Sequence, residues 1–225
     1  MNLSQASRLA EMALDMTEQP DVPRTLQRVA SHAHTSLGGA AAGVLLITDD
    51  QAPEPAASTD GLARRADLLQ VSSGAGPGLF EGGAEDVRVV SDTRTDGRWP
   101  SWGAVVAAFG WHSVLSVRLF TPTRPLGALT VYADEPDAFS AEARDLAGVF
   151  GRHASIAVMG ALSAQSLRTA VRSRHLIGQA QGILMQRFEV DADRAFTVLR
   201  RYSQDKNIKL RLVAEHVIAH HQLPD

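Results

Sequence analysis

Apolar residues recur every three or four positions in two stretches near the start of the chain, residues 3–17 and Pro23 to Leu37. That period places them on one face of an amphipathic helix. Two consecutive glycines, Gly38 and Gly39, follow the second stretch, and glycine commonly ends a helix. The pattern therefore predicts two helices before the first strand.

Four short apolar runs follow, and they predict strands. They are AGVLLIT (Ala42 to Thr48), DVRVV (Asp86 to Val90), SVLSVRLF (Ser113 to Phe120) and PLGALTVYA (Pro125 to Ala133). The last two runs, joined by the turn around TPTRP, predict an antiparallel hairpin. Helical stretches are expected near GPGLFEGG (residues 76–83) and at SWGAVVAAF (residues 101–109), and QAPEPAAST (residues 51–59) is interpreted as a loop.

From Ser140 onward the sequence predicts one very long helix. Ser140 is a good N-cap, and no proline follows it before Pro224. The 49 residues from Ser140 to Phe188 would extend roughly 70 Å at about 1.5 Å per residue. A heptad seam fits only in part: Leu146, Val149, Ile156, Leu167, Ala170, Ile177 and Leu184 are apolar, but His153, Ser163 and Arg174 share the register. Coiled-coil pairing and a bent or broken helix both stay open.

Two shorter amphipathic helices are expected after Glu189. Asp191 can cap the segment ADRAFTVLRRYSQ, and Asn207 is expected to cap KLRLVAEHVIAHH. Apolar residues repeat at helical spacing in both segments. Faces of this size are buried against one another, so the C-terminal part of the chain is predicted to be a three-helix bundle.

Composition narrows the function classes. The chain has no cysteine, which excludes disulfides, thiol nucleophiles and thiolate metal sites. It carries no apolar run near the ~20 residues of a membrane span and no secretory leader at its start, so a cytoplasmic protein without membrane contact is expected. The net charge is -3, yet residues 166–225 hold ten basic against six acidic residues. This asymmetry suggests two parts with different partners, although a solvated helical surface explains the charge equally well.

Catalytic and metal chemistry find little support in the sequence. Asp191 and Asp193 lie in the first turn of a predicted helix, where carboxylates complement the helix dipole. The histidine pairs His32/His34 and His220/His221 lack the spacing and acidic company of a metal site. We therefore expect a non-enzyme with no catalytic residues, no metal site and no cofactor.

The first part of the chain resembles a GAF domain of the actinobacterial type, from about Asp21 to Met159. The resemblance rests on GAGPG (residues 74–78), DTRTDGRWP (residues 92–100), HSVLSVRLF and LGALTVYADEPDAFSAEARDLAGVF, in that order. It implies an antiparallel sheet with helices on both faces and an unidentified small-molecule ligand. Many relatives read GPC where this chain reads Gly76-Pro77-Gly78, so thioether-linked bilins and cysteine-based sulfoxide reduction are excluded. No NKFDE-like series supports cyclic-nucleotide binding.

The last part strongly resembles an ANTAR domain, a family of RNA-binding transcription antiterminators. AQGILM, AFTVLRRYSQ and KLRLVAEHV stand in family order at family spacing. The resemblance implies a three-helix unit that binds paired stem-loops in nascent RNA and so prevents a terminator hairpin. The expected fold class is therefore α+β: a GAF-like sensor domain over residues 1–159, a helical or coiled-coil linker over 160–172, and an all-α RNA-binding domain over 173–225.

Gly178 and Gly182 lie four positions apart on one face of the long helix. Each glycine costs about 1 kcal/mol against alanine in a helix interior. Close packing of another backbone in the bundle is favoured as the reason for both, over direct contact with RNA.

Candidate RNA contacts follow from the chemistry of nucleic acids. Phosphates require basic groups, and an unpaired base stacks on a flat side chain. The basic candidates are Arg172, Arg174, Arg187, Arg200, Arg201, Lys206, Lys209 and Arg211, and the stacking candidates are His175 and Tyr202. Gln181 stands where relatives commonly have lysine; it can bind a base or ribose but cannot neutralise a phosphate. A solvated surface remains the alternative for each charge, and the bundle core for Tyr202.

Three functions stay open at this point. The first is a signal-responsive antiterminator that binds RNA, acting as a homodimer joined through the long helix. The second is a GAF sensor whose helical tail makes only protein contacts. The third is an unrecognised enzyme that uses the GAF pocket.

Overall fold

The computed structural model describes residues 3–48, 52–80 and 85–223. The chain divides into two compact units, residues 1–163 and 164–225, and each is described by itself. One helix, α5 (Ala141–Phe188), begins in the first unit and ends in the second.

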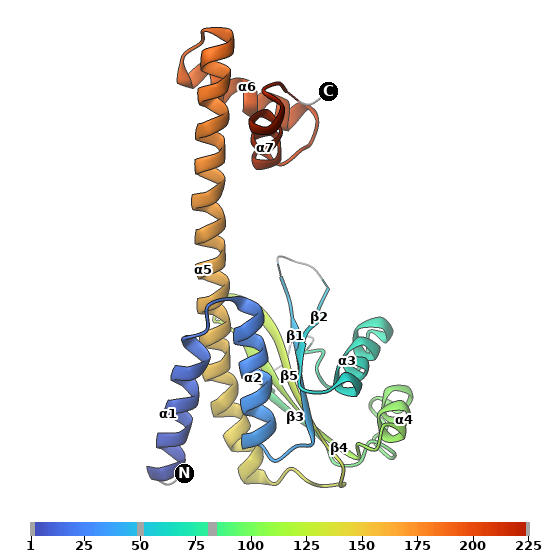
Figure 1. Cartoon of the computed structure of the whole chain (residues 1–225). Coiled ribbons are helices and arrows are strands. Elements are labelled where there is room, and N and C mark those ends of the chain that lie inside the picture. The colour runs from blue at the N-terminus through green and yellow to red at the C-terminus, as the bar shows by residue number, and fades with distance from the viewer. Residues whose placement is uncertain (1–2, 49–51, 81–84, 224–225) are drawn as a thin grey trace. The chain divides into compact units, whose positions relative to one another are not determined.

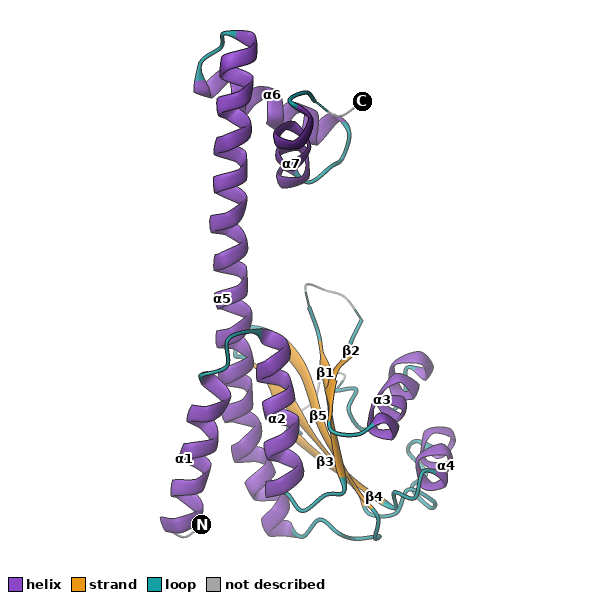
Figure 2. Cartoon of the chain, viewed as in Figure 1, coloured by secondary structure: helices purple, strands orange, loops and turns teal. Residues whose placement is uncertain are grey.

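A five-stranded antiparallel sheet forms the centre of the N-terminal unit (Figure 2). Its strands are β1 (Ala41–Leu46), β2 (Glu54–Ser58), β3 (Val87–Val90), β4 (Ser113–Phe120) and β5 (Pro125–Ala133), in the order β2-β1-β5-β4-β3. β4 and β5 pair as the predicted hairpin, with Leu115 opposite Val131 and Val117 opposite Leu129. The expected α+β class, with an antiparallel sheet, is confirmed.

Helices cover both faces of this sheet (Figure 1). On one face lie α1 (Leu3–Thr17), α2 (Val22–Ser36) and the first part of α5; on the other lie α3 (Gly61–Ser73) and α4 (Pro100–Ala108). Successive strand residues point to opposite faces. Leu115 accordingly joins the core beneath α2 and α5, whereas its neighbour Val114 joins the core beneath α3 and α4.

Two predicted elements of this unit were wrong. The expected loop contains the edge strand β2, which tolerates Pro55 because an edge strand has unpaired backbone groups. The helix expected near GPGLFEGG lies earlier, as α3, capped by Asp60 and ended by left-handed Gly74. Residues 76–80 form a turn and irregular chain, and residues 81–84 lie outside the described residues. The sequence pattern did not predict α3, because two of its buried residues, Asp67 and Gln70, are polar. They interrupt the helical spacing of apolar residues on which such a prediction depends.

Helix α5 runs without a break for 48 residues. The Ser140 hydroxyl accepts a hydrogen bond from the Ala143 amide at 3.2 Å, as expected of an N-cap. Among the described helices, α5 is by length and composition alone long and apolar enough to cross a membrane. Its residues Ala147, Phe150 and Ala154 are buried against the sheet, however, which is the behaviour of a core helix.

The end of α5 packs with α6 (Ala192–Asp205) and α7 (Leu210–His220) in the C-terminal unit. The core of this bundle consists of Ala180, Leu184, Ala195, Leu199, Val213, Ala214 and Val217. Asp191 caps α6 as predicted, accepting from the Arg194 amide at 2.7 Å. Asn207 does not cap α7: it has a φ of 52°, and α7 begins after Lys209 without a side-chain cap. Asparagine tolerates this left-handed conformation, so here it ends one helix instead of starting the next.

Candidate nucleic-acid interface

The C-terminal unit presents most of the predicted RNA-binding residues to solvent. The exposed ones are Arg172, Arg174, His175, Arg187, Arg200, Arg201, Lys206, Lys209 and Arg211. Gln181 and Tyr202 are half-buried. Exposure is necessary for contact with a macromolecule, so most of this set is available for binding.

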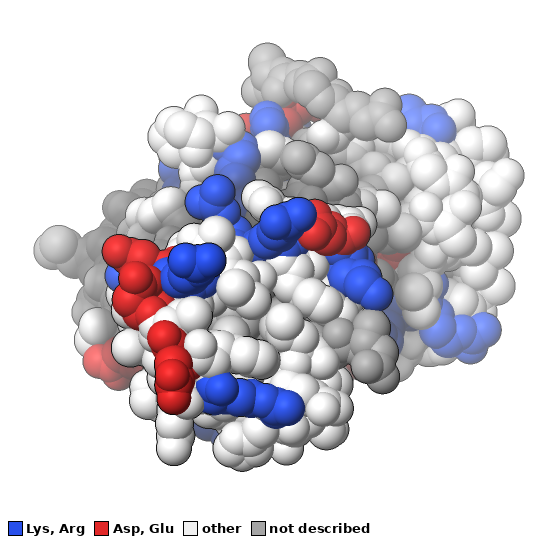
Figure 3. Space-filling model, turned by 90° about the horizontal axis from the view of Figure 1, so that it is seen from above, with Lys and Arg blue, Asp and Glu red and all other residues white. Residues whose placement is uncertain are grey.

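The structure does not gather these residues on one face. Arg172 and Arg174 are two positions apart on α5, and at about 100° per residue they project to nearly opposite sides of the helix. His175 lies beside Leu167 and Val171 in a shallow groove on α5. Figure 3 shows basic and acidic side chains side by side on the surface seen from above, with uncharged surface between them. On this face the positive charge is therefore interspersed with acidic and uncharged surface.

Two of the residues predicted to contact RNA form hydrogen bonds within the bundle. The Gln181 side-chain amide donates to the Ala192 carbonyl at 3.1 Å, which joins α5 to the start of α6. Arg187 donates to the His221 carbonyl at the end of α7. Sequence reasoning did not foresee these contacts, because both acceptors are backbone atoms that carry no side-chain signal.

Tyr202 lies against the bundle core, and the Lys206 ammonium sits 5.8 Å from the centre of its ring. The cation covers ring surface on which a base would have to stack. The core interpretation of Tyr202 thus has a direct structural basis.

Two of the arginines take part in exposed ion pairs within their own helices. Arg201 approaches Asp205 at 3.6 Å and Arg211 approaches Glu215 at 3.5 Å, both at i, i+4 spacing. Exposed pairs of this kind contribute little free energy, so both arginines can exchange their partner for a phosphate at small cost.

The packing explanation for Gly178 and Gly182 was wrong. A Cβ added at either position would meet no atom within 4 Å, apart from the helix itself, in the described structure. Both glycines are exposed, on the side of α5 away from Ala180 and Leu184 in the bundle core. Within the described residues, no close packing in the bundle compensates for their low helix propensity.

Family models match both parts of the chain. The model described as GAF domain matches residues 19–159, and the model described as ANTAR domain matches residues 165–218. The chain belongs to the GAF family and carries a C-terminal ANTAR domain. Both are sensing and regulatory domains. A search among curated proteins found no significant match.

Solved structures share the fold of this GAF protein at low identity. The bacteriophytochrome of R. palustris has a TM-score of 0.55 at 13% identity over 82% of this chain and 43% of its own. The photosensory core module of the Stigmatella aurantiaca phytochrome has a TM-score of 0.60 at 11% identity, over 94% of this chain and 46% of its own. A domain of a sensor histidine kinase protein from Sinorhizobium meliloti 1021 has a TM-score of 0.55 at 13% identity, over 67% of this chain and 99% of its own. The chain thus spans less than half of the two phytochrome chains.

A buried polar cluster stands out inside the GAF domain. The Tyr132 hydroxyl donates to Oδ1 of Asp67 at 2.7 Å, and the Gln70 amide donates to the same oxygen at 3.1 Å. Oδ2 of Asp67 has no hydrogen-bond partner in the described structure. Burial raises the pKa of Asp67 to about 7, although the bonds from Tyr132 and Gln70 oppose the shift. The described residues hold no group of three or more His, Asp or Glu side chains placed to bind a metal.

Proposed function

We propose that the protein is a signal-responsive regulator that binds stem-loops in nascent mRNA and acts as a transcription antiterminator. The match of residues 165–218 to the ANTAR family carries this proposal, because ANTAR is an RNA-binding antitermination module. The preceding GAF domain supplies the sensing part. Since nascent transcripts form in the cytoplasm of a bacterial cell, we propose that location for the protein.

The exposed basic residues support phosphate contacts in this proposal. Arg200 on α6 and Lys209 before α7 are both exposed, as are Arg174 and His175 on α5. Exposed cations of this kind can contact phosphate oxygens of a stem-loop RNA. Gln181 and Arg187 already bond to backbone carbonyls, so we assign them to the integrity of the bundle first.

RNA binding by the full-length protein tests the proposal. A paired stem-loop RNA should bind with an affinity that falls as salt rises, because phosphate contacts release counterions. Arg200→Ala and Lys209→Ala should each weaken binding and lower the salt slope, by up to about 0.7 for a single-stranded phosphate. Arg152→Ala is the matched control, since Arg152 is an exposed arginine of the GAF domain. No binding at moderate salt would overturn the proposal.

Antitermination itself needs a second measurement. In a purified transcription reaction, the protein should increase read-through past a terminator that overlaps the second stem-loop. A terminator without upstream stem-loops is the control, and equal read-through on both templates would contradict antitermination.

A second candidate is a GAF sensor whose helical tail mediates dimerisation without RNA. Exposed apolar residues on α5 favour it: Leu167 is 67% exposed and Val171 is 61% exposed. Both candidates predict a homodimer, which light scattering would detect as twice the 24.1 kDa chain mass. Only the antiterminator binds stem-loop RNA, so the RNA measurement separates the two.

A further inference from the structure

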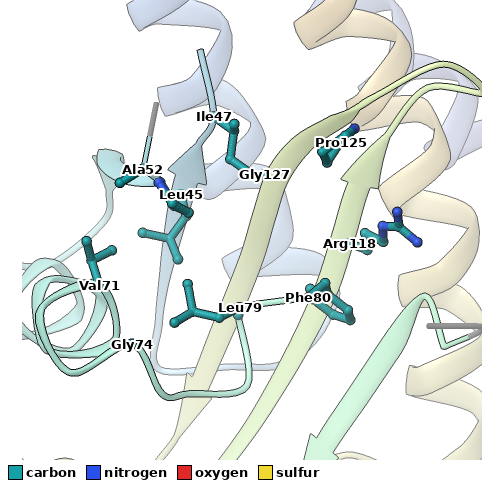
Figure 4. A pocket seen from close by; sticks show the side chains of 12 residues that line it. Leu45, Ile47, Ala52, Val71, Gly74, Leu79, Phe80, Arg118, Pro125 and Gly127 are labelled. Carbon is teal, nitrogen blue, oxygen red and sulfur yellow. The ribbon is translucent and has the colours of Figure 1, made fainter. Parts of the chain in front are cut away.

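A cavity of about 270 Å³ opens at one end of the GAF domain's sheet, on the side covered by α3 (Figure 4). Its walls come from β1, from the end of α3, from residues 78–80 and from the β4–β5 hairpin. In Figure 4, Leu45, Val71 and Leu79 lie on one side of it and Arg118 on the other. Drug-sized ligand sites occupy about 300–1,000 Å³. The volume therefore suits a compound smaller than a drug.

The walls are chemically asymmetric. Leu45, Ile47, Val71, Leu79 and Phe80 supply apolar surface. Among the described residues that line the cavity, Arg118 alone has a formal charge. A guanidinium presents paired N–H donors that match the two oxygens of a carboxylate. An apolar body with one anionic group is the chemistry that such walls recognise.

Two glycines in the wall of the cavity are closely packed against the surrounding protein. A Cβ on Gly78 would press against Leu45, Thr130 and Gln70, and Gly127 has a φ of 142°, which side-chain-bearing residues rarely adopt. The Gly78 amide donates to the side-chain carbonyl of Gln70 at 2.7 Å. Through Gln70 the wall of the cavity is bonded to Asp67, so the site is tied to the buried polar cluster of the domain.

We propose that this cavity binds a small carboxylic acid with an apolar aliphatic or monocyclic aromatic body, whose carboxylate meets Arg118. The assignment rests on the proposed function in one respect only: it names the class of signal that the GAF domain would sense. A nucleotide is a poor fit, because its sugar and phosphates would face aliphatic side chains without hydrogen-bond partners.

Binding to the full-length protein without RNA tests this site directly. Isothermal titration with octanoate and benzoate is compared with titration of the neutral analogues 1-octanol and benzyl alcohol. At least one carboxylate should bind roughly tenfold or more tightly than its alcohol, since a charge-assisted hydrogen bond adds to the apolar contact. Arg118→Gln should abolish this preference, and Arg124→Gln, an exposed arginine on the same hairpin, should leave it unchanged.

A second pair of variants tests the location independently of Arg118. Val71→Trp places a large side chain in the cavity and should remove binding of both carboxylates. Leu68→Trp, on the same helix but 46% exposed and outside this cavity, should bind like the wild-type protein.

Three outcomes would overturn the proposal: no saturable binding of either carboxylate at millimolar concentration, equal affinity for acid and alcohol, or full binding by Val71→Trp. These titrations contain no RNA. If the carboxylates do not bind in the cavity but the protein binds stem-loop RNA, the ligand site alone is refuted. If a carboxylate binds but stem-loop RNA does not, the antiterminator function alone is refuted.

Discussion

Three glycines of the GAF domain have surroundings opposite to those of the two glycines in the ANTAR domain. In the GAF domain, a Cβ on Gly39, Gly43 or Gly127 would overlap neighbouring atoms, because strands, loops and side chains approach these positions closely. In the ANTAR domain, Gly178 and Gly182 face open space in the described structure. The first group serves the fold from inside, whereas the second has no internal reason to be glycine.

The buried chemistry follows the same division. The GAF domain encloses its polar cluster of Asp67, Gln70 and Tyr132 and a small cavity beside it. Among its described residues, the ANTAR domain buries only apolar ones and places its basic groups at the surface. A domain that senses a small molecule has to close around it, and a domain that binds a macromolecule has to expose its contacts.

The largest effect is expected from Gly127→Ala. The new Cβ would overlap the Leu45 carbonyl oxygen, and the φ of 142° is strained for alanine, so the GAF domain should lose on the order of 4 kcal/mol or more of stability. Urea unfolding followed by tryptophan fluorescence measures this, since Trp102 and Trp111 are buried in the domain. Gly160→Ala is the control, because its Cβ would meet open space. Equal stabilities of the two variants would contradict the difference between closely packed and open glycines.

The buried Asp67 should make stability depend on pH. Its folded pKa of about 7 lies above the ordinary 3.8, so the unfolded chain loses this proton first as pH rises. The free energy of unfolding should therefore fall between about pH 4 and about pH 7, by on the order of a few kcal/mol at about 1.4 kcal/mol per pKa unit. Asp67→Asn should flatten this part of the curve, while Asp60→Asn at the exposed helix cap should not.

The third prediction concerns the open glycines. Gly178→Ala and Gly182→Ala should each stabilise α5 by up to about 1 kcal/mol, because alanine has the higher helix propensity and meets no clash. If a partner approaches this face, the double variant should at the same time bind stem-loop RNA about tenfold more weakly. Circular dichroism and RNA titration report the two quantities, with Gly160→Ala as the control on the same helix. Undiminished RNA affinity would show that RNA does not contact the face of α5 that carries Gly178 and Gly182.

The smallest stability effect is expected at Arg201. Its ion pair with Asp205 is exposed, so Arg201→Ala should change the free energy of unfolding by less than about 1 kcal/mol. The same variant should lower the salt slope of RNA binding if Arg201 meets a phosphate. A large loss of stability would show that the pair is more than a surface contact.

Sequence patterns predicted elements where side chains repeat with a clear period. The β4–β5 hairpin, α4 and the capped start of α6 were predicted because their apolar spacing or cap residues are local signals. β2 was missed because Pro55 and its alanine neighbours have low strand propensity and pair only through the neighbouring strand β1. α3 was missed because it buries Asp67 and Gln70, whose partners lie far away in the sequence.

The sequence supplies candidate RNA contacts, which stay a prediction, but it does not predict how the fold arranges them. The sequence marks Arg172 and Arg174 as basic, and the helix then separates them to opposite sides. The acceptors for Gln181 and Arg187 are carbonyl groups of Ala192 and His221, which appear only when three helices come together. The cavity beside Arg118 has no sequence motif, because residues from separate parts of the chain line it.

The absent side chain of Gly43 in β1 leaves the space in which Oδ2 of Asp67 lies. We therefore expect residues 43 and 67 to coevolve. A lineage that gains a side chain at position 43 has to shorten position 67 first, and each single step passes through a destabilised intermediate. Relatives are expected to keep both residues together or to lose both together, so the buried acid and the bare strand position should be inherited as a pair.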